Sequence, residues 1–331
     1  MTSRRSRAIP PRLRSSTARG ARLALRGPRS SSQTGFGAWS SMVYEGEAFC
    51  PGHVTAFFEV CDDPDPRRKG SRGAGLCLSQ GVRTVARVRE ASRDSLEIFV
   101  NGRPTNAEVS ARAARKILKH GPYEVKILSD TRLPVSQGFG VSAAGALSTV
   151  LALDDALGLG LSREDLVTAA HVADVESHTG LGDVVPASLG GMDLRLEPGA
   201  PGHCDVRRFA VRAELLLAVL GPEIPTKSVL ADPSKVAGIN RSGAACVKEF
   251  AANPTFAGLF EIGIRFAEET GLASRTILDV AKASRMFGRA TMALLGNAIV
   301  ASGNRDELTV LLRRFGTVLQ CEVEDEGARV L

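Results

Sequence analysis

A glycine- and serine-rich turn directly before a run of helix-forming residues is the feature that most limits what this chain can fold into. Residues 134–148 read PVSQGFGVSAAGALS, and residues 149–153 continue as TVLAL. Glycine lets the backbone approach a ligand closely, and the unpaired amides at a helix N-terminus attract phosphate. The run has neither the P-loop pattern nor the dinucleotide fingerprint. It therefore predicts a phosphate-binding turn, and from composition alone a turn for tight helix–strand packing fits about equally well.

The composition narrows the class of protein. Hydrophobic residues make up 44% of the 331 residues and charged residues 24%. This balance is typical of a globular protein with a large core, and the length fits two ordinary domains or one large one. No apolar run reaches the length of about 18 residues that a membrane-spanning helix needs. Six cysteines lack any C-x-x-C pair, so we expect reduced, packed thiols in a cytoplasmic protein and no zinc site.

The positive charge of the chain is concentrated in residues 1–41. This segment contains nine arginines, no lysine and no acid, whereas residues 42–331 carry 33 basic and 36 acidic side chains. It shows no apolar periodicity, so we expect it to be disordered. It is interpreted as a transit peptide, a nucleic-acid-binding arm or a start codon assigned upstream of Met42, and we favour the last. Because the remaining chain is slightly acidic, no nucleic-acid partner is expected for it.

Beyond Met42 the pattern mixes strands and helices, which predicts an α+β protein. A helix is expected over 106–120, and a second one begins with Ser162 as N-cap and Asp165 at its third position. A further helix is capped by Asn304. The expected strands of the first half are 43–49, 54–60, 82–88, 96–100 and 125–128.

A change of pattern divides the chain into two parts. The dense apolar run within 212–220 predicts a central strand, and the sequence beyond it is predominantly helical. We therefore place a domain boundary near residue 205, which gives domains at 43–205 and 206–331.

The glycine-rich turn also resembles a motif of a known family. The pattern P-x-S-x-G-F-G-x-S-A-A at 134–144 is similar to the central ATP-binding motif of the GHMP kinases, the superfamily of galactokinase, homoserine kinase, mevalonate kinase and phosphomevalonate kinase. Residues 48–53 (AFCPGH) resemble the first motif of that superfamily. Residues 180–183 (GLGD), followed by Gly190 and Gly191, resemble a mevalonate kinase pattern.

A narrower resemblance is to the archaeal pantoate kinases. It is carried by FCPGHVT at 49–55, GSRGAG at 70–75 and TGLGDV at 179–184, and it covers essentially residues 43–331. The resemblance implies the two-domain GHMP kinase fold, with an N-terminal domain like domain 2 of ribosomal protein S5 and a ferredoxin-like C-terminal domain. It also implies a homodimeric enzyme of coenzyme A biosynthesis that uses ATP and Mg²⁺ to phosphorylate the primary hydroxyl of pantoate.

The same motifs imply where ATP and Mg²⁺ bind. Ser142 and Glu176 are expected to bind Mg²⁺, since a hydroxyl and a carboxylate are hard oxygen ligands. The alternatives are a helix N-cap for Ser142 and a solvated carboxylate for Glu176. The expected ATP-binding residues are Pro134, Ser136, Gly138, Phe139, Gly140, Ser142, Ala143 and Ala144.

Asp183 is the candidate catalytic base. Gly182 and the apolar pair at 184–185 flank it, so we expect partial desolvation to raise the pKa of its carboxylate, while a nearby Mg²⁺ opposes that rise. The alternative is an aspartate that caps a glycine-rich turn. Some superfamily members work without this aspartate, so positioning of the substrates alone is a further alternative.

Four residues are expected to bind the acceptor. Arg72 is the first choice for the acceptor carboxylate, because a guanidinium binds a carboxylate through two hydrogen bonds, and Lys227 is the second. The alternative for both is an ordinary surface charge. His53 and Thr55 are expected at the acceptor hydroxyls, with a buried core pair as the alternative. His53 stands where several relatives carry Lys or Arg, so the local charge depends on pH.

Other functions fit parts of the same pattern. The third glycine-rich motif of the superfamily is represented only by the degenerate MALLGNA at 292–298, so its part in holding phosphate is open. Homoserine or mevalonate are alternative acceptors, whereas a phosphorylated acceptor needs more cations than the sequence offers. A non-catalytic protein that binds nucleotide and metabolite is a further alternative, against which the presence of Ser142, Glu176 and Asp183 argues.

Overall fold

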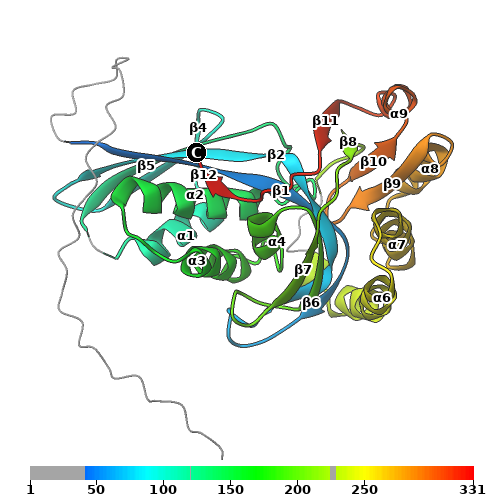
Figure 1. The fold of residues 1–331 in the computed structure, drawn as a ribbon, viewed down its shortest axis with the longest axis horizontal. Coiled ribbons are helices and arrows are strands. Elements are labelled where there is room, and N and C mark those ends of the chain that lie inside the picture. The colour runs from blue at the N-terminus through cyan, green and yellow to red at the C-terminus, as the bar shows by residue number, and fades with distance from the viewer. Residues whose placement is uncertain (1–41, 120, 224–228) are drawn as a thin grey trace, which may run out of the picture.

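Two β-sheets with helices packed against them make up the protein (Figure 1). The computed structural model describes residues 42–119, 121–223 and 229–331. The basic segment 1–41 lies outside the described residues. Largely antiparallel sheets with separate helices confirm the predicted α+β class. No helix in the described ranges is long and apolar enough to cross a membrane.

Two long strands hold the fold together. β1 (Tyr44–Cys61) and β2 (Gly70–Glu90) pair antiparallel from end to end, with shifts of register after Pro51 and after Thr55. Such bulges change the direction in which a side chain points. Here they lie on either side of His53, in the part of β1 that carries two of the predicted site residues.

The first sheet has the order β12-β1-β2-β5-β3-β4, and β6 and β7 extend it from β2. The first half of β2 pairs with β6 and its second half pairs with β5. β12 brings the C-terminus of the chain back to β1 (Figure 1). The remaining strands are β3 (Ser95–Val100), β4 (Arg103–Thr105), β5 (Tyr123–Thr131), β6 (Met192–Glu197), β7 (Asp205–Phe209) and β12 (Arg329–Val330).

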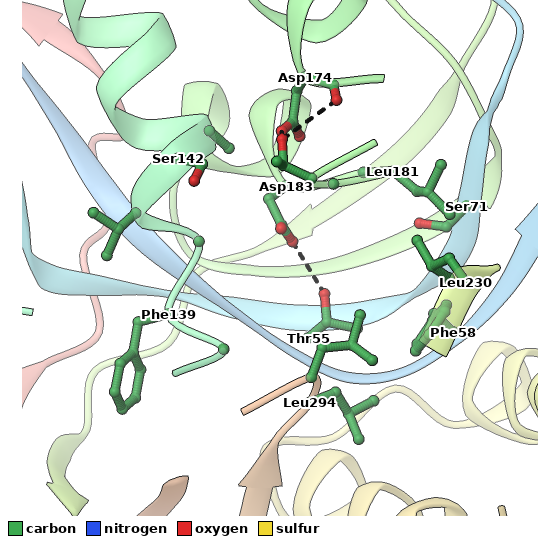
Figure 2. A pocket seen from close by; sticks show the side chains of 18 of the residues that line it. Thr55, Phe58, Ser71, Phe139, Ser142, Asp174, Leu181, Asp183, Leu230 and Leu294 are labelled. Carbon is green, nitrogen blue, oxygen red and sulfur yellow. Dashed lines mark hydrogen bonds between the residues drawn. The ribbon is translucent and has the colours of Figure 1, made fainter. Parts of the chain in front are cut away.

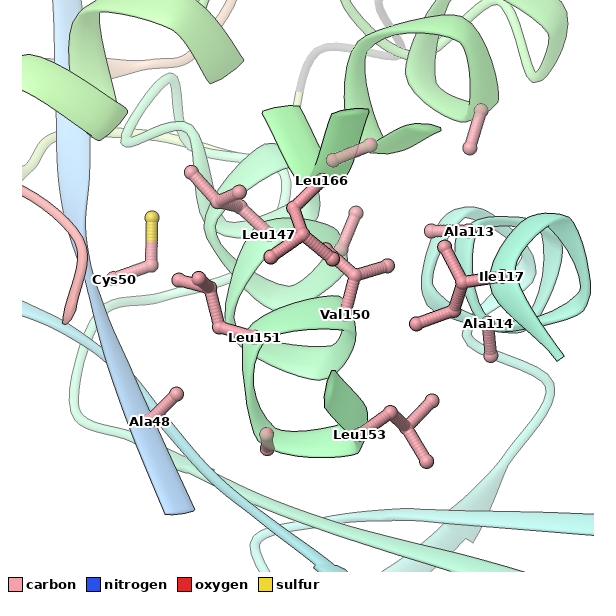
Figure 3. Packing of buried hydrophobic residues seen from close by; sticks show 14 of the residues in the cluster. Ala48, Cys50, Ala113, Ala114, Ile117, Leu147, Val150, Leu151, Leu153 and Leu166 are labelled. Atoms are coloured by element: carbon pink, nitrogen blue, oxygen red, sulfur yellow. The ribbon is translucent and has the colours of Figure 1, made fainter. Parts of the chain in front are cut away.

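Helix α2 (Val141–Leu157) is the central element of the first core. It is apolar on nearly all sides, and a helix with this composition is stable only when it is buried all round. Figure 3 shows its leucines and valine packed between β1, the helix α1 and the helix α3. Removing a buried leucine side chain from such a core costs about 2–5 kcal/mol. The labelled contacts of α2 are Ala48, Cys50, Ala113, Ala114, Ile117 and Leu166.

Two of the predicted helices cover α2. α3 (Arg163–Glu176) begins as predicted, since the Ser162 hydroxyl accepts the N–H of Asp165. α1 spans Glu108–Ile117, which is shorter at both ends than the predicted 106–120. It ends early because Leu118 already leaves helical backbone angles, with φ −78° and ψ 73°.

The second sheet has the order β11-β8-β10-β9 and packs against helices α7 to α9, whereas α6 lies against β1 and β2 of the first sheet (Figure 1). β8 lies between two neighbours, so the prediction of a central strand within 212–220 is confirmed. Asn304 caps α9 as predicted, by accepting the N–H of Glu307. The elements are β8 (Glu214–Val219), β9 (Gly288–Ala293), β10 (Ala298–Gly303), β11 (Val318–Glu322), α6 (Pro233–Ala252), α7 (Phe256–Glu269), α8 (Arg275–Ser284) and α9 (Arg305–Leu312).

One shared core joins the two sheets. Phe57 of β1 meets Phe250 of α6 edge to face at 5.5 Å between ring centroids, and Phe58 meets Phe266 of α7 at 5.9 Å. The chain passes from one sheet to the other between β7 and β8, a few residues after the predicted boundary at 205. The first part of the chain therefore supplies residues to the second core, and the cavity described below lies along this junction.

Candidate active site

The predicted phosphate-binding turn connects β5 to α2 and holds an unusual backbone. Gly138 and Gly140 have φ values of +79° and +63°. A Cβ on Gly138 would lie 2.5 Å from the carbonyl oxygen of Ala293, so no larger residue fits there. The first α2 hydrogen bond runs from the N–H of Ala144 to the oxygen of Gly140. The amides of 141–143 therefore cannot bond within the helix and are available to a ligand.

The degenerate third motif supports this turn. Gln137 accepts the N–H of Asn297 through its Oε1 at 3.0 Å, and its amide nitrogen donates to the oxygen of Gly221 at 3.3 Å. Leu294 and Leu295 line the same cavity as the turn. The segment 292–298 thus supports the turn, and it needs a glycine at 296, because a Cβ there would lie 2.1 Å from the carbonyl carbon of Gln137.

A cavity of about 290 Å³ lies in front of the turn (Figure 2). Four parts of the chain meet around it: the turn with the start of α2, the segment that follows α3, the end of β1 with the start of β2, and apolar residues of the second part of the chain, which are Leu230, Leu294 and Leu295. Among the described residues, no Lys or Arg lines it. Its lining includes Thr55, Phe58, Ser71, Ser136, Gly138, Phe139, Gly140, Ser142, Ala143, Asp174, Gly180, Gly182 and Asp183.

Asp174 is the buried carboxylate of this cavity, and the sequence did not single it out. Thr179 donates a hydrogen bond of 2.7 Å to its Oδ1. Burial, together with the negative charge of Asp183, raises the pKa of Asp174 to about 7. A buried carboxylate without a cationic partner favours either a proton or a metal ion.

Glu176, the predicted Mg²⁺ ligand, does not reach the cavity. Its carboxylate lies 2.9 Å from Nζ of Lys116 and 3.6 Å from Nη1 of Arg112, on the side of α3 that faces α1. Two residues along a helix correspond to a rotation of about 200°, so Asp174 and Glu176 point to opposite sides. At this end of α3 the cavity is lined by Asp174 and not by Glu176.

Asp183, the predicted base, stands at the start of α4 (Val184–Leu189) and faces the cavity (Figure 2). Its Oδ1 accepts the Thr55 hydroxyl at 3.2 Å and lies 2.8 Å from Nδ1 of His53. Burial alone raises the pKa of this carboxyl, but the hydrogen bond and charge of His53, the charge of Arg195 and the Thr55 hydroxyl hold it below its ordinary value. The predicted rise of the pKa is therefore wrong, because these partners outweigh desolvation.

His53 is buried behind Asp183 and is not part of the cavity wall. Its Nε2 lies 2.7 Å from Oδ1 of Asp193, a residue of β6. Burial lowers the pKa of the imidazole, but the charges of Asp193 and Asp183 raise it above its ordinary value. The structure thus brings His53 to Asp183, and the predicted contact of His53 with the acceptor hydroxyls stays a prediction.

Arg195 is the second residue that the sequence did not single out. It is 2% exposed, its Nη2 donates to the Thr55 hydroxyl at 3.3 Å, and its Nη1 donates to the oxygen of Gly182 at 3.3 Å. Its Nε has no hydrogen-bond partner among the described residues. The signal for it was the strand MDLRLE, in which charged residues alternate with apolar ones, so that Asp193 and Arg195 share one face.

Comparison with known proteins identifies the family. The model of the GHMP kinases N terminal domain matches residues 108–191. A pantoate kinase of Methanospirillum hungatei is 32% identical over 289 residues, which are 86% of this chain and 96% of that protein. This chain belongs to the GHMP kinase family. A pantoate kinase of Methanocaldococcus jannaschii is 28% identical over 284 residues, which cover 83% of this GHMP kinase and 99% of the relative.

Solved structures agree with this membership. A protein described as a phosphotransferase related to the CoA biosynthesis pathway superposes on this GHMP kinase with a TM-score of 0.78 and 29% identity, over 88% of this chain and 99% of that chain. A homoserine kinase of Cytophaga hutchinsonii has the same fold, with a TM-score of 0.60 and 18% identity over 89% and 99% of the two chains. The predicted family and the two-domain fold are confirmed.

Arg72, the first choice for the acceptor carboxylate, does not line the cavity of this kinase. Its Nε donates to Glu59 at 2.9 Å, and a second guanidinium nitrogen contacts the same carboxylate. Ser71 lines the cavity instead, because neighbouring residues of a strand point to opposite faces of the sheet. Lys227, the second choice for the acceptor carboxylate, lies outside the described residues.

A divalent cation fits the site of this GHMP kinase only together with nucleotide phosphates. Asp174 and Ser142 line the same cavity from two sides. Within the described ranges there is no group of three or more His, Cys, Asp or Glu side chains that could hold a metal ion. Mg²⁺ commonly binds through one or two protein oxygens, phosphates and water, and the pair present here suits that mode.

Proposed function

We propose that this GHMP kinase transfers the γ-phosphoryl group of ATP to the primary hydroxyl of pantoate, forming 4-phosphopantoate for coenzyme A biosynthesis. One observation carries the proposal: the residues whose amides precede Ala144 and the residue Asp183 line a single cavity. A phosphate donor and an alcohol acceptor can therefore meet between them. Similarity to pantoate kinases over most of the chain supports pantoate as the acceptor.

The turn is proposed to hold the triphosphate of ATP. The free amides of 141–143 and the positive end of the α2 dipole favour a phosphate that lies across Gly138 and Gly140. The hydroxyls of Ser136 and Ser142 add donors on either side. Pro134 and Ala144 are not among the residues that line the cavity, so we propose that they shape the turn and leave the contacts to its centre.

Asp174 and Ser142 are proposed to hold Mg²⁺. Both are hard oxygen ligands, and Asp174 is a buried carboxylate whose raised pKa marks an uncompensated negative charge. When bound, Mg²⁺ neutralises negative charge on the phosphates.

Asp183 is proposed to orient the acceptor hydroxyl. The alcohol oxygen forms a bond to the γ-phosphorus while the bond from that phosphorus to the bridging oxygen of ADP breaks, and the hydroxyl proton passes to Asp183. Because its pKa lies below the ordinary value, Asp183 is a weak base that accepts the proton only as the new bond forms. Its main contribution is alignment, and kinases depend largely on positioning and electrostatics.

Arg195 is proposed to supply the positive charge for the acceptor carboxylate. It touches Thr55 and Gly182, both of which line the cavity, and its Nε lacks a partner among the described residues. A guanidinium in a buried position interacts with a carboxylate more strongly than a solvated one does. With the hydroxyl of Ser71 close by, this end of the cavity suits a small hydroxy acid.

A product screen tests the proposed function. The full chain is incubated with ATP, Mg²⁺ and, separately, pantoate, homoserine, mevalonate or pantothenate, and phosphorylated products are identified by phosphorus NMR and mass spectrometry. We expect a product from pantoate at a rate well above the others. If a different acceptor is phosphorylated, that compound replaces pantoate as the proposed substrate. Binding of ATP without turnover of any acceptor would support the non-catalytic alternative.

The homodimer and the cytoplasmic location are also proposals. The six cysteines are free thiols, which suits a reducing compartment. Light scattering after size-exclusion chromatography tests the assembly, and a dimer gives about twice the chain mass of 34.9 kDa.

A further inference from the structure

Five side chains form a closed ring of polar contacts behind the cavity. Asp183 contacts His53, His53 contacts Asp193, Asp193 faces Arg195, Arg195 contacts Thr55, and Thr55 returns to Asp183. The five distances are 2.8, 2.7, 3.4, 3.3 and 3.2 Å in that order. Charges alternate around the ring, and its members come from β1, α4 and β6.

The two carboxylates determine the protonation of His53. Both ring nitrogens lie within hydrogen-bond distance of a carboxylate oxygen, and an ionised carboxylate can only accept. Both nitrogens can donate only when the ring carries two protons and a positive charge. A buried cation needs a partner for its charge, and here Asp183 and Asp193 each provide one.

Packing leaves the imidazole no second position. A Cβ on Gly75 of β2 would lie 2.5 Å from Nε2 of His53, so the ring fills the space that this glycine leaves. The backbone N–H of His53 donates to the oxygen of Phe139 in the phosphate turn. Cys77, opposite His53 in the register, has a thiol that stays neutral because burial raises its pKa. Asp183 and Asp193 are the charged groups that contact the imidazole among the described residues, and Arg195 lies beyond them, against Asp193 and Thr55.

Asp193 contacts both basic members of this ring of polar contacts, His53 and Arg195. Its Oδ1 lies against His53, which leads to the hydroxyl-orienting carboxylate, and its Oδ2 faces Arg195, which leads to the acceptor end of the cavity. It does not line the cavity itself and is 1% exposed. We propose that Asp193 is a positioning residue that keeps His53 charged and aligns Asp183 and Arg195 together, an inference that rests on the proposed kinase function.

The matched substitution is Asp193→Asn. The amide keeps an oxygen of the same shape for Nε2 but removes the negative charge, and its NH₂ group can donate to a neutral ring nitrogen. His53 is then expected to lose one proton, and Asp183 to lose its cationic neighbour. Asp154→Asn is the control, since it changes a half-buried carboxylate at the far end of α2 that accepts the N–H of Leu161 at 3.0 Å.

The first readout needs no substrate. Nitrogen–proton NMR of the full chain at pH 7 reports the ring N–H groups of its histidines, and His53→Gln identifies the signals of His53. We expect two ring N–H signals for His53 in the native protein and one in Asp193→Asn. A single ring N–H in the native protein overturns the proposal whatever the variants do, including a case in which Asp193→Asn fails to fold.

The second readout is kinetic. With the acceptor that the product screen identifies, Asp193→Asn is expected to lower kcat by about 100-fold and to raise the KM of the acceptor. The KM of ATP is expected to stay within about 3-fold, because the turn is held through backbone contacts. The acidic limb of the kcat profile is expected to move to higher pH, since Asp183 loses its cation.

The outcomes separate this inference from the proposed function. A lower kcat with an unmoved acidic limb, or a loss equal to that of Asp154→Asn, would show a merely structural role and overturn the inference. If pantoate is not phosphorylated but another acceptor is, the acceptor assignment fails while both readouts still decide the role of Asp193. If no acceptor is phosphorylated, the NMR readout alone decides whether Asp193 keeps His53 charged.

Discussion

Thr179 donates a hydrogen bond of 2.7 Å to Oδ1 of Asp174, and Gly180 lies directly against the other oxygen of that carboxylate. A Cβ on Gly180 would stand only 2.1 Å from Oδ2, so the segment after α3 closes tightly over Asp174. Two residues further along, Glu176 is bound by Lys116 on the other side of the helix. One helix end thus presents two carboxylates with different surroundings, and they form a matched pair for experiment.

Asp174→Asn is expected to lower kcat by at least about 100-fold and to raise the Mg²⁺ concentration needed for half-maximal activity. Glu176→Gln, which changes the ion pairs with Lys116 and Arg112, is expected to stay within about 3-fold of the native rate, since partly exposed ion pairs contribute little. Initial rates over a Mg²⁺ titration check both variants. Equal losses in the two variants would contradict the assignment of Asp174 as the ligand.

Asp183→Asn is expected to reduce turnover by about 10²–10⁴-fold and to leave the fold intact. The amide oxygen still accepts the Thr55 hydroxyl, but it can neither take the proton nor pair with a charged His53. Single-turnover rates measure the loss, and circular dichroism with thermal unfolding monitors the fold. Near-normal turnover would remove Asp183 from the reaction.

Arg195 and Arg72 offer a second contrast, between a buried guanidinium that contacts two residues of the cavity wall and one paired with Glu59. Arg195→Gln is expected to raise the KM of the hydroxy acid by about 10–100-fold and to change the KM of ATP little, and Arg195→Lys is expected to recover part of the loss. Arg72→Ala is expected to leave both constants within about 3-fold. A larger rise of the KM of the hydroxy acid in Arg72→Ala than in Arg195→Gln would assign the carboxylate contact to Arg72 instead.

Gly138→Ala is expected to raise the KM of ATP by about 10-fold or more. Its φ of +79° and the carbonyl oxygen of Ala293 leave no room for a Cβ, so the phosphate turn has to move. Gly158→Ala is the control, because Gly158 ends α2 at φ +59° with no atom within 4 Å of the added carbon. It is expected to cost about 1 kcal/mol of stability, with unchanged kinetics. Comparable effects of both variants on ATP binding would contradict the role of the turn.

His171 gives a prediction for stability against pH. Burial lowers its pKa below the ordinary 6.5, and its Nε2 lies 3.0 Å from the backbone oxygen of Lys69. The unfolded chain therefore binds the proton more tightly, so the stability that the neutral ring provides is complete above about pH 6.5 and falls as the pH drops through the folded pKa. His171→Gln is expected to lose less free energy of unfolding than the native protein between pH 7.5 and 5. Urea unfolding at both pH values checks this, and parallel losses would contradict it.

Local patterns were enough to predict several helices, parts of the strands β1, β2, β3 and β5, and the glycine-rich turn, but not that 43–49 and 54–60 form one strand or that β9 to β12 follow the apolar run at 212–220. Ser162 and Asn304 cap their helices because an N-cap depends only on the next three residues. The turn at 134–148 was predicted equally well, since positive φ values favour glycine and glycine can be recognised in the sequence. The end of α1 was predicted less well, because the helix ends at Leu118, where no glycine indicates the end in the sequence.

What the sequence alone determined was therefore the α+β class, the glycine-rich turn and its helix, all of which rest on neighbours in the chain, whereas Asp183 was indicated by the family resemblance. Only the tertiary structure decided that Asp174 faces the cavity instead of Glu176, that Arg72 turns to Glu59, and that Asp193 contacts both His53 and Arg195. The pKa of Asp183 was mispredicted for the same reason. The pKa of a buried group depends on the groups that pack against it, and His53 is 130 residues away in the sequence. Electrostatic interactions depend on the distance between groups in space, and the separation of two residues in the sequence does not give that distance.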